Sequence, residues 1–284
     1  MYRRIYFFLK EIFFPKKPIH AIPLGITKSP FPKGTSTMAE AAYNAIAKEY
    51  KESKKLPYRY FLEQFTLFSL VGKLHGKKVL DLACGEGFYS RKLKKQGAAS
   101  VLAVDLSEEM ICLAKQEEDR NPLGIKYLAS DASQMGIQGT YDLVFAAYLL
   151  NYAQSKEQLL NFCQVIYDNL KVGGRFVSIN DNPMQSVETY HLCKKYGFDK
   201  CSQEFRKQGS PIAYTMHLPD ETVFSFDNYY FSPETYEAVF RTCGFKSFSW
   251  HPIRVSPKGI AEYENGYWDD LVKYQPFVCL KALK

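Results

Sequence analysis

The sequence lacks the patterns of a metal-bound, disulfide-linked or membrane-spanning protein. Its cysteines include no CxxC pair and no companion histidine at zinc-ligand spacing. No run approaches the roughly 18 apolar residues that a membrane span needs. We therefore expect a globular, cytoplasmic protein with no metal and with seven reduced thiols, at Cys84, Cys112, Cys163, Cys193, Cys201, Cys243 and Cys279.

An excess of positive charge is also lacking over most of the chain. The net charge of +7 comes almost wholly from residues 1–37, which carry seven basic residues and one acid. The other residues hold 30 basic and 29 acidic side chains, so they offer no basic face that could neutralise nucleic-acid phosphates. The expected partner is a small molecule and not a nucleic acid.

Residues 1–37 are a basic, aromatic arm followed by a linker rich in proline and glycine. Lys10 and Glu11 interrupt its apolar run, and no small-residue cleavage site follows, which argues against a secretory signal. A short helix over residues 1–17 could make weak contact with an anionic membrane surface. The alternatives are a flexible extension or a true start at Met38. We expect a flexible arm and one domain over residues 38–284.

Residues 38–284 alternate apolar strands with helical segments. A capping box at Thr37-x-x-Glu40 begins a helix, and a second helical stretch runs from Tyr58 to about Leu74. Five strands follow, separated by helices, which predicts a mostly parallel sheet: KKVLDLA, SVLAVDL, IKYLASD, YDLVFAAY and GGRFVSIND. Residues 182–231 then form an insertion or lid, in which SPIAYTMHL and TVFSFDNYYF alternate like antiparallel strands. A helix from Ser232 and two strands, near 245–251 and 276–283, end the chain.

The loop after the first strand, DLACGEGFYS, carries a ligand-binding signal. Ligands of open α/β sheets bind at the carboxyl ends of strands. Gly85 and Gly87 begin a pattern like GxGxxG, but Ser90 stands in place of the third glycine. Asp81 and Glu86 would repel a pyrophosphate and would favour a ligand that carries positive charge. A nicotinamide dinucleotide is therefore disfavoured.

The next two strands also end in acids. Asp105 ends the second strand, where a carboxylate can accept hydrogen bonds from both ribose hydroxyls, and Asp131 ends the third, where it could accept from an adenine amino group. A cationic end, a ribose and an adenine together describe S-adenosylmethionine. Any one of these acids could instead cap the helix that follows it.

The whole set of motifs resembles the class I, Rossmann-like S-adenosylmethionine-dependent methyltransferases. The motifs are VLDLACGEG, AVDLSEEM, ASDAS, YDLVFAAYLLNYA and LKVGGRFV. The resemblance implies an α/β three-layer sandwich whose last strand is antiparallel. AAYNAIAKEY, FDNYYFSPETYEAVFRTCGF and WHPIRVSPKGIAEYENGYW are in turn similar to the toxoflavin-synthase-like small-molecule N-methyltransferases.

This resemblance implies methylation of a small, planar or aromatic metabolite on nitrogen or oxygen, with nitrogen favoured. A membrane-associated lipid or quinone methyltransferase is one alternative, and a non-catalytic S-adenosylmethionine-binding module is another. The lid is rich in tyrosine and phenylalanine, whose rings suit a flat acceptor held by stacking or fill the lid's own core. The acceptor and the oligomeric state stay open at this point.

The expected cofactor contacts lie at the ends of the first four strands: Asp81, Ala83, Gly85, Gly87, Asp105, Leu106, Met110, Asp131, Ala132 and Ala146. Tyr148 should border the reacting centre. By resemblance, Tyr43 could close over the sulfonium, although it could equally pack on an apolar helix face. His217 or His191 in the lid could act as a base, since histidine titrates near neutral pH.

Overall fold

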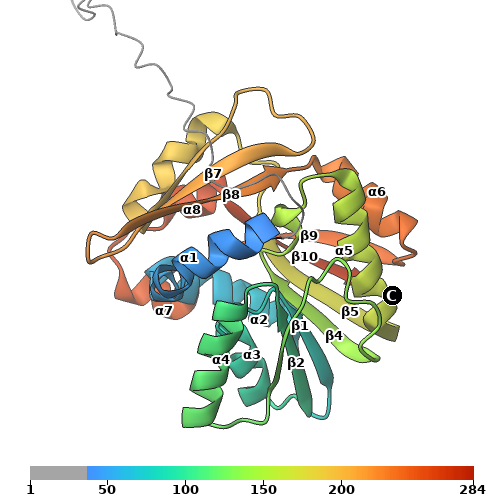
Figure 1. Cartoon of the computed structure of the whole chain (residues 1–284). Coiled ribbons are helices and arrows are strands. Elements are labelled where there is room, and N and C mark those ends of the chain that lie inside the picture. Colours follow the sequence, from blue (N-terminus) through green and yellow to red (C-terminus); the bar gives the residue numbers. More distant parts are fainter. Residues whose placement is uncertain (1–36) are drawn as a thin grey trace, which may run out of the picture. The chain divides into compact units, whose positions relative to one another are not determined.

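A computed structural model describes the backbone of residues 37–284 and the side chains from Asn44 onwards, within a compact unit that spans Thr35–Lys284 (Figure 1). The arm expected over residues 1–37 lies outside the described residues, apart from Thr37. Within the described part, no helix is long and apolar enough to cross a membrane.

A seven-stranded sheet in the order β3-β2-β1-β4-β5-β10-β9 forms the centre of this unit. Strands β1 to β5 run parallel, and β10 runs antiparallel between β5 and β9. The expected α/β fold with an antiparallel last strand is confirmed. The strands are β1 Lys78–Leu82, β2 Ser100–Asp105, β3 Lys126–Ala129, β4 Tyr141–Ala147, β5 Leu170–Asp181, β9 Ser247–Pro252 and β10 Phe277–Leu283.

Helices cover both faces of this sheet. Helices α2 (Phe65–Val71), α3 (Phe88–Lys95) and α4 (Glu108–Arg120) pack on one face, and α5 (Lys156–Asn169) and α6 (Pro233–Thr242) pack on the other (Figure 1). Successive side chains of β4 point to opposite layers, so Phe145 joins the first core and Ala146 the second. A central strand buried on both faces explains its unbroken apolar sequence.

The segment before β1 differs from the expected pair of helices. Helix α1 (Thr37–Ser53) forms and contacts α4. The second stretch divides into a π-helical turn, η1 (Arg59–Gln64), and α2, which ends before Gly72 at a φ of +68°. The π-helical turn buries Arg59 and Glu63, two charged residues that no apolar periodicity could reveal.

Residues 182–231, called the lid below, contain the helical segment η3 (Val187–Tyr196) and a three-stranded antiparallel sheet. Its strands are β6 (Phe198–Cys201), β7 (Ser210–His217) and β8 (Val223–Tyr230), and β8 contacts α1. Strands β7 and β8 were expected. Four elements were not, because each is short or weakly periodic: η3, β6, α7 (Pro257–Glu262) and α8 (Asp269–Tyr274).

Phe198 anchors the lid to the body of the fold. Its side chain is fully buried, and its ring centroid lies 5.0 Å from those of Tyr58 and Phe277. It also lies 6.4 Å from the ring of Tyr214 on β7. One aromatic cluster therefore joins β6 and β7 to η1 and β10.

We expect Phe198→Ala to lower the free energy of unfolding by about 3–5 kcal/mol, because it leaves a cavity in this cluster. Phe205→Ala is the control, since Phe205 is 81% exposed in the same lid. Urea denaturation measures both changes, and similar losses in the two variants would contradict the anchoring role.

Candidate active site

The loop between β1 and α3 has the backbone of a site that a ligand approaches closely. Ala83, Gly85 and Gly87 have positive φ angles of 55°, 55° and 84°. A Cβ atom on Gly87 would lie 2.6 Å from the hydroxyl oxygen of Tyr127. Glycine is therefore required at position 87 by both its conformation and its neighbour.

Asp105 holds this loop against the end of β2. Its Oδ2 accepts a hydrogen bond of 2.7 Å from the backbone N–H of Gly85, and its Oδ1 accepts one of 3.0 Å from the N–H of Ser107. Burial raises the pKa of Asp105, and these two donors oppose the rise. The side chain is partly exposed, so a ligand can still reach the carboxylate.

Asp81 lies beneath the loop and not on its surface. It is 1% exposed, and Ser90 of α3 donates a hydrogen bond of 2.5 Å to its Oδ2. Burial raises the pKa of Asp81 to about 7, against the effect of that hydrogen bond. Asp81 thus fixes the first turn of α3 from below the loop, and its contact with a ligand, through water or directly, stays a prediction.

Glu86 brings a carboxylate with an unsatisfied oxygen to the same loop. It is 6% exposed, and its Oε2 has no hydrogen-bond partner among the described residues. Burial raises the pKa of Glu86, and the charge of Lys54, just after α1, opposes the rise. Lys54 acts in the same sense on Asp81 and Asp105. Three carboxylates around one ammonium group favour a cationic ligand over a phosphate.

The adenine end of the expected site is only partly as predicted. Met110 is buried, and its Sδ lies 4.0 Å from where a Cβ of Gly85 would stand. Leu106 is half-buried, and Ala132 and Ala146 are buried. Asp131 was expected to end the third strand, but β3 stops at Ala129.

The carboxylate of Asp131 accepts hydrogen bonds from residues just after it. These come from the N–H and hydroxyl of Ser133, both at 2.7 Å, and from the side chain of Gln134 at 2.9 Å. Such bonds are typical of a turn that caps itself. The side chain is half-buried, so a recognition role for the adenine edge stays a prediction.

A buried carboxylate, Glu63, stands behind the site. Arg59 donates to its Oε2 at 2.8 Å and Tyr148 at 2.6 Å, and Tyr89 donates to its Oε1. Burial alone would raise the pKa of Glu63, but the Arg59 charge and the two tyrosine donors hold it below its usual range. The hydroxyl of Tyr148 is thereby engaged, so Tyr148 is a positioning residue here. Nothing in the local sequence marks Glu63.

The other two expected catalytic groups are His217 and Tyr43. His217 lies on the face of β7 opposite the buried Tyr214 and Met216, and its Nε2 lies 2.9 Å from Oδ2 of Asp199. Its side chain lies on the face of β7 away from the buried rings, because side chains alternate along a strand, and its role as a base stays a prediction. Tyr43 belongs to α1, but its side chain lies outside the described part.

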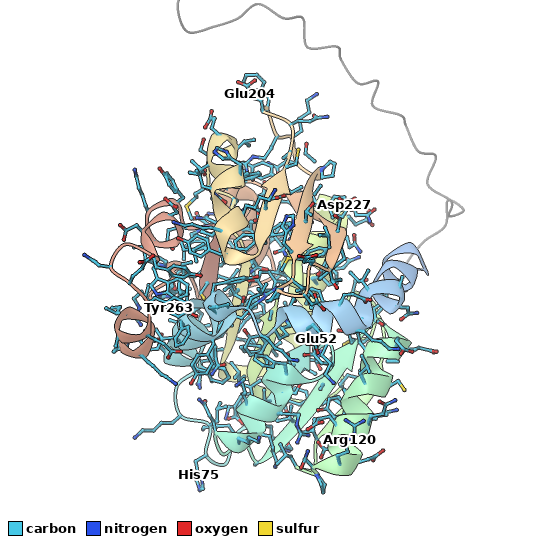
Figure 2. All side chains as sticks on the ribbon, turned by 90° about the vertical axis from the view of Figure 1, so that its left-hand side faces the viewer. Glu52, His75, Arg120, Glu204, Asp227 and Tyr263 are labelled. Atoms are coloured by element: carbon cyan, nitrogen blue, oxygen red, sulfur yellow. The ribbon has the colours of Figure 1, made fainter. Side chains whose placement is uncertain are left out.

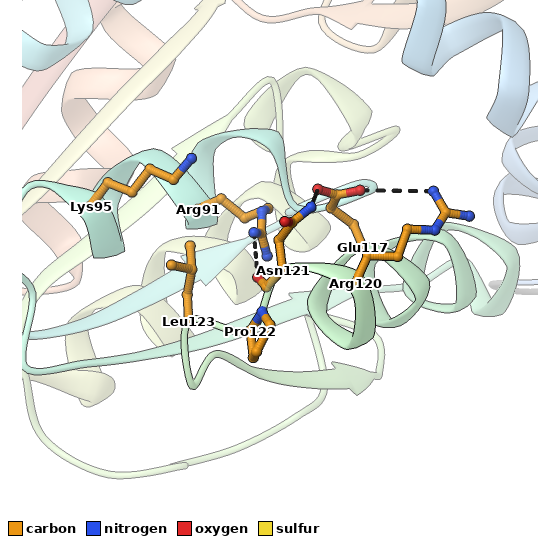
Figure 3. A pocket seen from close by; sticks show the side chains of 7 residues that line it. All are labelled: Arg91, Lys95, Glu117, Arg120, Asn121, Pro122 and Leu123. Carbon is orange, nitrogen blue, oxygen red and sulfur yellow. Dashed lines mark hydrogen bonds and ion pairs between the residues drawn. The ribbon is translucent and has the colours of Figure 1, made fainter.

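A groove of about 540 Å³ lies at the other end of the parallel strands (Figure 3). Its lining includes Arg91, which donates to Glu118 at 2.7 Å and to the carbonyl of Asn121 at 2.6 Å. Arg120, also in this groove, lies at the end of the unit opposite Asp227 of the lid (Figure 2). None of the predicted cofactor contacts lines this groove.

Comparison with known proteins agrees with this geometry. Residues 79–174 match the family described as "Methyltransferase domain". The fold is that of an S-adenosylmethionine-dependent methyltransferase from Clostridium acetobutylicum, with a TM-score of 0.58, 19% identity, and coverage of 85% of this chain and 98% of that one. Residues 79–174 are a class I S-adenosylmethionine-dependent methyltransferase domain.

Two further proteins are similar to this chain. A second S-adenosylmethionine-dependent methyltransferase structure, from Mesorhizobium loti, has a TM-score of 0.57 and 19% identity and covers 78% of this chain and 97% of that one. The ubiquinone biosynthesis O-methyltransferase of Coxiella burnetii is 33% identical over 112 residues, which are 38% of this chain and 46% of that protein. The chain spans about half the length of the curated relatives it matches.

The residues present fit S-adenosylmethionine, which carries an ammonium group and a sulfonium but no phosphate. The unpartnered oxygen of Glu86 suits the ammonium group. The positive φ angles of Gly85 and Gly87 let the backbone approach the methionine portion. Asp105 keeps an exposed edge at which a ribose diol can donate.

Gly87→Ala should weaken S-adenosylmethionine binding by about tenfold or more, because the added methyl displaces Tyr127 and the loop. Gly124→Ala is the matched control. Gly124 has a similar φ of 77°, but a Cβ there meets nothing within 4 Å. Isothermal titration calorimetry should show a loss in the first variant only, and equal affinity in both would count against a ligand at this loop.

Proposed function

We propose that this chain transfers the methyl group of S-adenosylmethionine to a small, planar or aromatic acceptor, with nitrogen as the favoured nucleophile. The proposal rests on the acidic loop after β1 together with a lid whose aromatic side chains face the interior. On the buried side of the lid, the rings of Tyr214 and Phe226 stack at 5.4 Å with an interplanar angle of 8°. When bound, S-adenosylmethionine supplies an electrophilic methyl group on its sulfonium.

In this reaction the residues of the chain position the cofactor and the acceptor and exclude water. Gly85, Gly87 and Asp105 hold the cofactor, and α1 and β8 contact each other over the site. An in-line displacement needs the nucleophile about 3 Å from the methyl group, aligned and dry. A neutral amine or ring nitrogen attacks with its lone pair as the C–S bond breaks, and the cationic nitrogen so formed releases its proton to water, so the reaction does not require His217.

A second candidate is O-methylation of a lipid or quinone. It is favoured by the name of the Coxiella burnetii relative and by the seven basic residues within residues 1–37. Liposome co-sedimentation with and without residues 1–37 separates this candidate from a soluble-metabolite enzyme. Binding to anionic vesicles that is indifferent to the deletion would exclude a membrane role for the arm.

Release of S-adenosylhomocysteine from a panel of acceptors, heterocyclic amines first, tests the proposed reaction. Asp105→Ala should weaken S-adenosylmethionine binding about tenfold or more, since the loop and the ribose lose one shared acceptor. Asp142→Asn is the control, because Asp142 lies at the other end of β4, paired with Lys171. Wild-type affinity in Asp105→Ala would overturn the cofactor site. Tight binding without product from any acceptor would instead indicate a non-catalytic module.

Binding should also depend on pH through Asp81. The pKa of Asp81 is about 7 in the folded protein, which is above its value in the unfolded chain. The neutral form of Asp81 therefore stabilises the fold at low pH, and this stability is lost as pH rises through 7. The carboxylate formed there attracts the sulfonium. Between about pH 5 and pH 9, affinity for S-adenosylmethionine should therefore rise more than affinity for S-adenosylhomocysteine. Asp81→Asn should flatten this difference, and a difference that persists in the variant would exclude Asp81 as its source.

A further inference from the structure

The buried face of the lid carries a carboxamide among its aromatic rings. On β8, Phe224, Phe226, Asn228 and Tyr230 share this face, since side chains alternate along a strand. Asn228 is 2% exposed, and its Oδ1 has no hydrogen-bond partner among the described residues. A buried amide oxygen without a hydrogen-bond donor is energetically unfavourable, and a group that donates to it removes this cost.

A second buried carboxamide lies on the element that packs against β8. The short helical segment η2 (Leu150–Tyr152) follows the end of β4 and contacts β8. Asn151 is 1% exposed, and its Oδ1 accepts a hydrogen bond of 3.2 Å from the N–H of Asp181. This bond fixes the orientation of the amide and leaves Nδ2 as a donor without a partner in residues 37–284.

Two buried asparagines of the described residues, Asn169 and Asn182, are satisfied at both ends. Asn169 accepts from the N–H of Gln138 at 2.7 Å and donates to the carbonyl of Val165 at 2.9 Å. Asn182 accepts from the N–H of Met184 at 3.0 Å and donates to the carbonyl of Gln275 at 2.7 Å. Asn180 on β5 also has an unpartnered oxygen. Asn151 and Asn228 differ from it because they lie on elements that contact each other, so their two free groups point to one shared ligand.

The surroundings describe the shape of that ligand. Asn228 follows Phe226 by two residues on the same face, next to the stacked ring of Tyr214. The hydroxyl of Tyr214 donates to Oδ1 of Asp181, the residue whose N–H binds Asn151. Tyr214 is therefore a neighbour of Asn228 across the β7–β8 pair and is connected to Asn151 through Asp181.

We propose that Asn151 and Asn228 recognise the methyl acceptor, and that the acceptor is a heteroaromatic ring with a carbonyl and an N–H or O–H on one edge. The carbonyl accepts from Nδ2 of Asn151, and the N–H or O–H donates to Oδ1 of Asn228. This inference rests on the proposed methyl transfer, because it identifies the acceptor class of the same site.

The test uses 2-quinolone, which has this edge, and N-methyl-2-quinolone, in which a methyl group replaces the hydrogen of the N–H donor. Titration calorimetry with the full chain, with and without S-adenosylhomocysteine, should show that wild-type protein binds 2-quinolone about tenfold or more tightly than its N-methyl analogue. Asn228→Leu should remove that preference while S-adenosylhomocysteine affinity and the melting temperature stay at or above wild-type values.

Asn180→Leu is the matched control. Asn180 is also buried with an unpartnered oxygen, but it alternates with Asp181 on β5 and so points to the other face of the sheet. It should keep the preference for 2-quinolone. No preference in wild type, or a preference that survives Asn228→Leu, would overturn the inference. Failure of the proposed function gives a different result, which is loss of cofactor binding or of S-adenosylhomocysteine release from every acceptor.

Discussion

The geometry of the cofactor loop depends on one buried charge, the carboxylate of Glu63. It receives donors from three elements: Arg59 within η1, Tyr89 in α3 and Tyr148 after β4. A buried carboxylate without partners would be strongly unfavourable, so these elements stabilise the fold only in this arrangement. The loop with Gly85 and Gly87 runs directly into α3, so a group far from any ligand determines where the loop stands.

A second buried ion pair fixes the position of another element, the lid, at the end of β5. Lys200 of the lid is fully buried and lies 2.6 Å from Oδ1 of Asp181. Tyr214 donates to the same oxygen. The lid is therefore attached to the sheet by a charge pair as well as by the ring of Phe198. The ends of β4 and β5 thus have different surroundings: the first is fixed to α3 and the cofactor loop, the second to the lid.

The sequence predicts the sheet and the loop well because their signals are local. Buried strands such as β4 are continuous apolar runs, and Gly85, Gly87 and Asp105 follow strand ends at characteristic spacing. Glu63 could not be found this way, since its partner Tyr148 is 85 residues away. The orientation of His217 could be predicted, because apolar Tyr214 and Met216 indicate which face of β7 is buried.

The distribution of charge connects the two halves of the site. In the proposed reaction, Asp81, Glu86 and Asp105 would place negative charge at the end of the site that binds the sulfonium. At the lid end, Asp181 and Lys200 neutralise each other, and the free polar groups are uncharged amides. A protonated amine would be repelled by the sulfonium and would find no carboxylate of its own here. A neutral ring with a free lone pair meets neither obstacle, which is the form in which a nucleophile reacts with a methyl sulfonium.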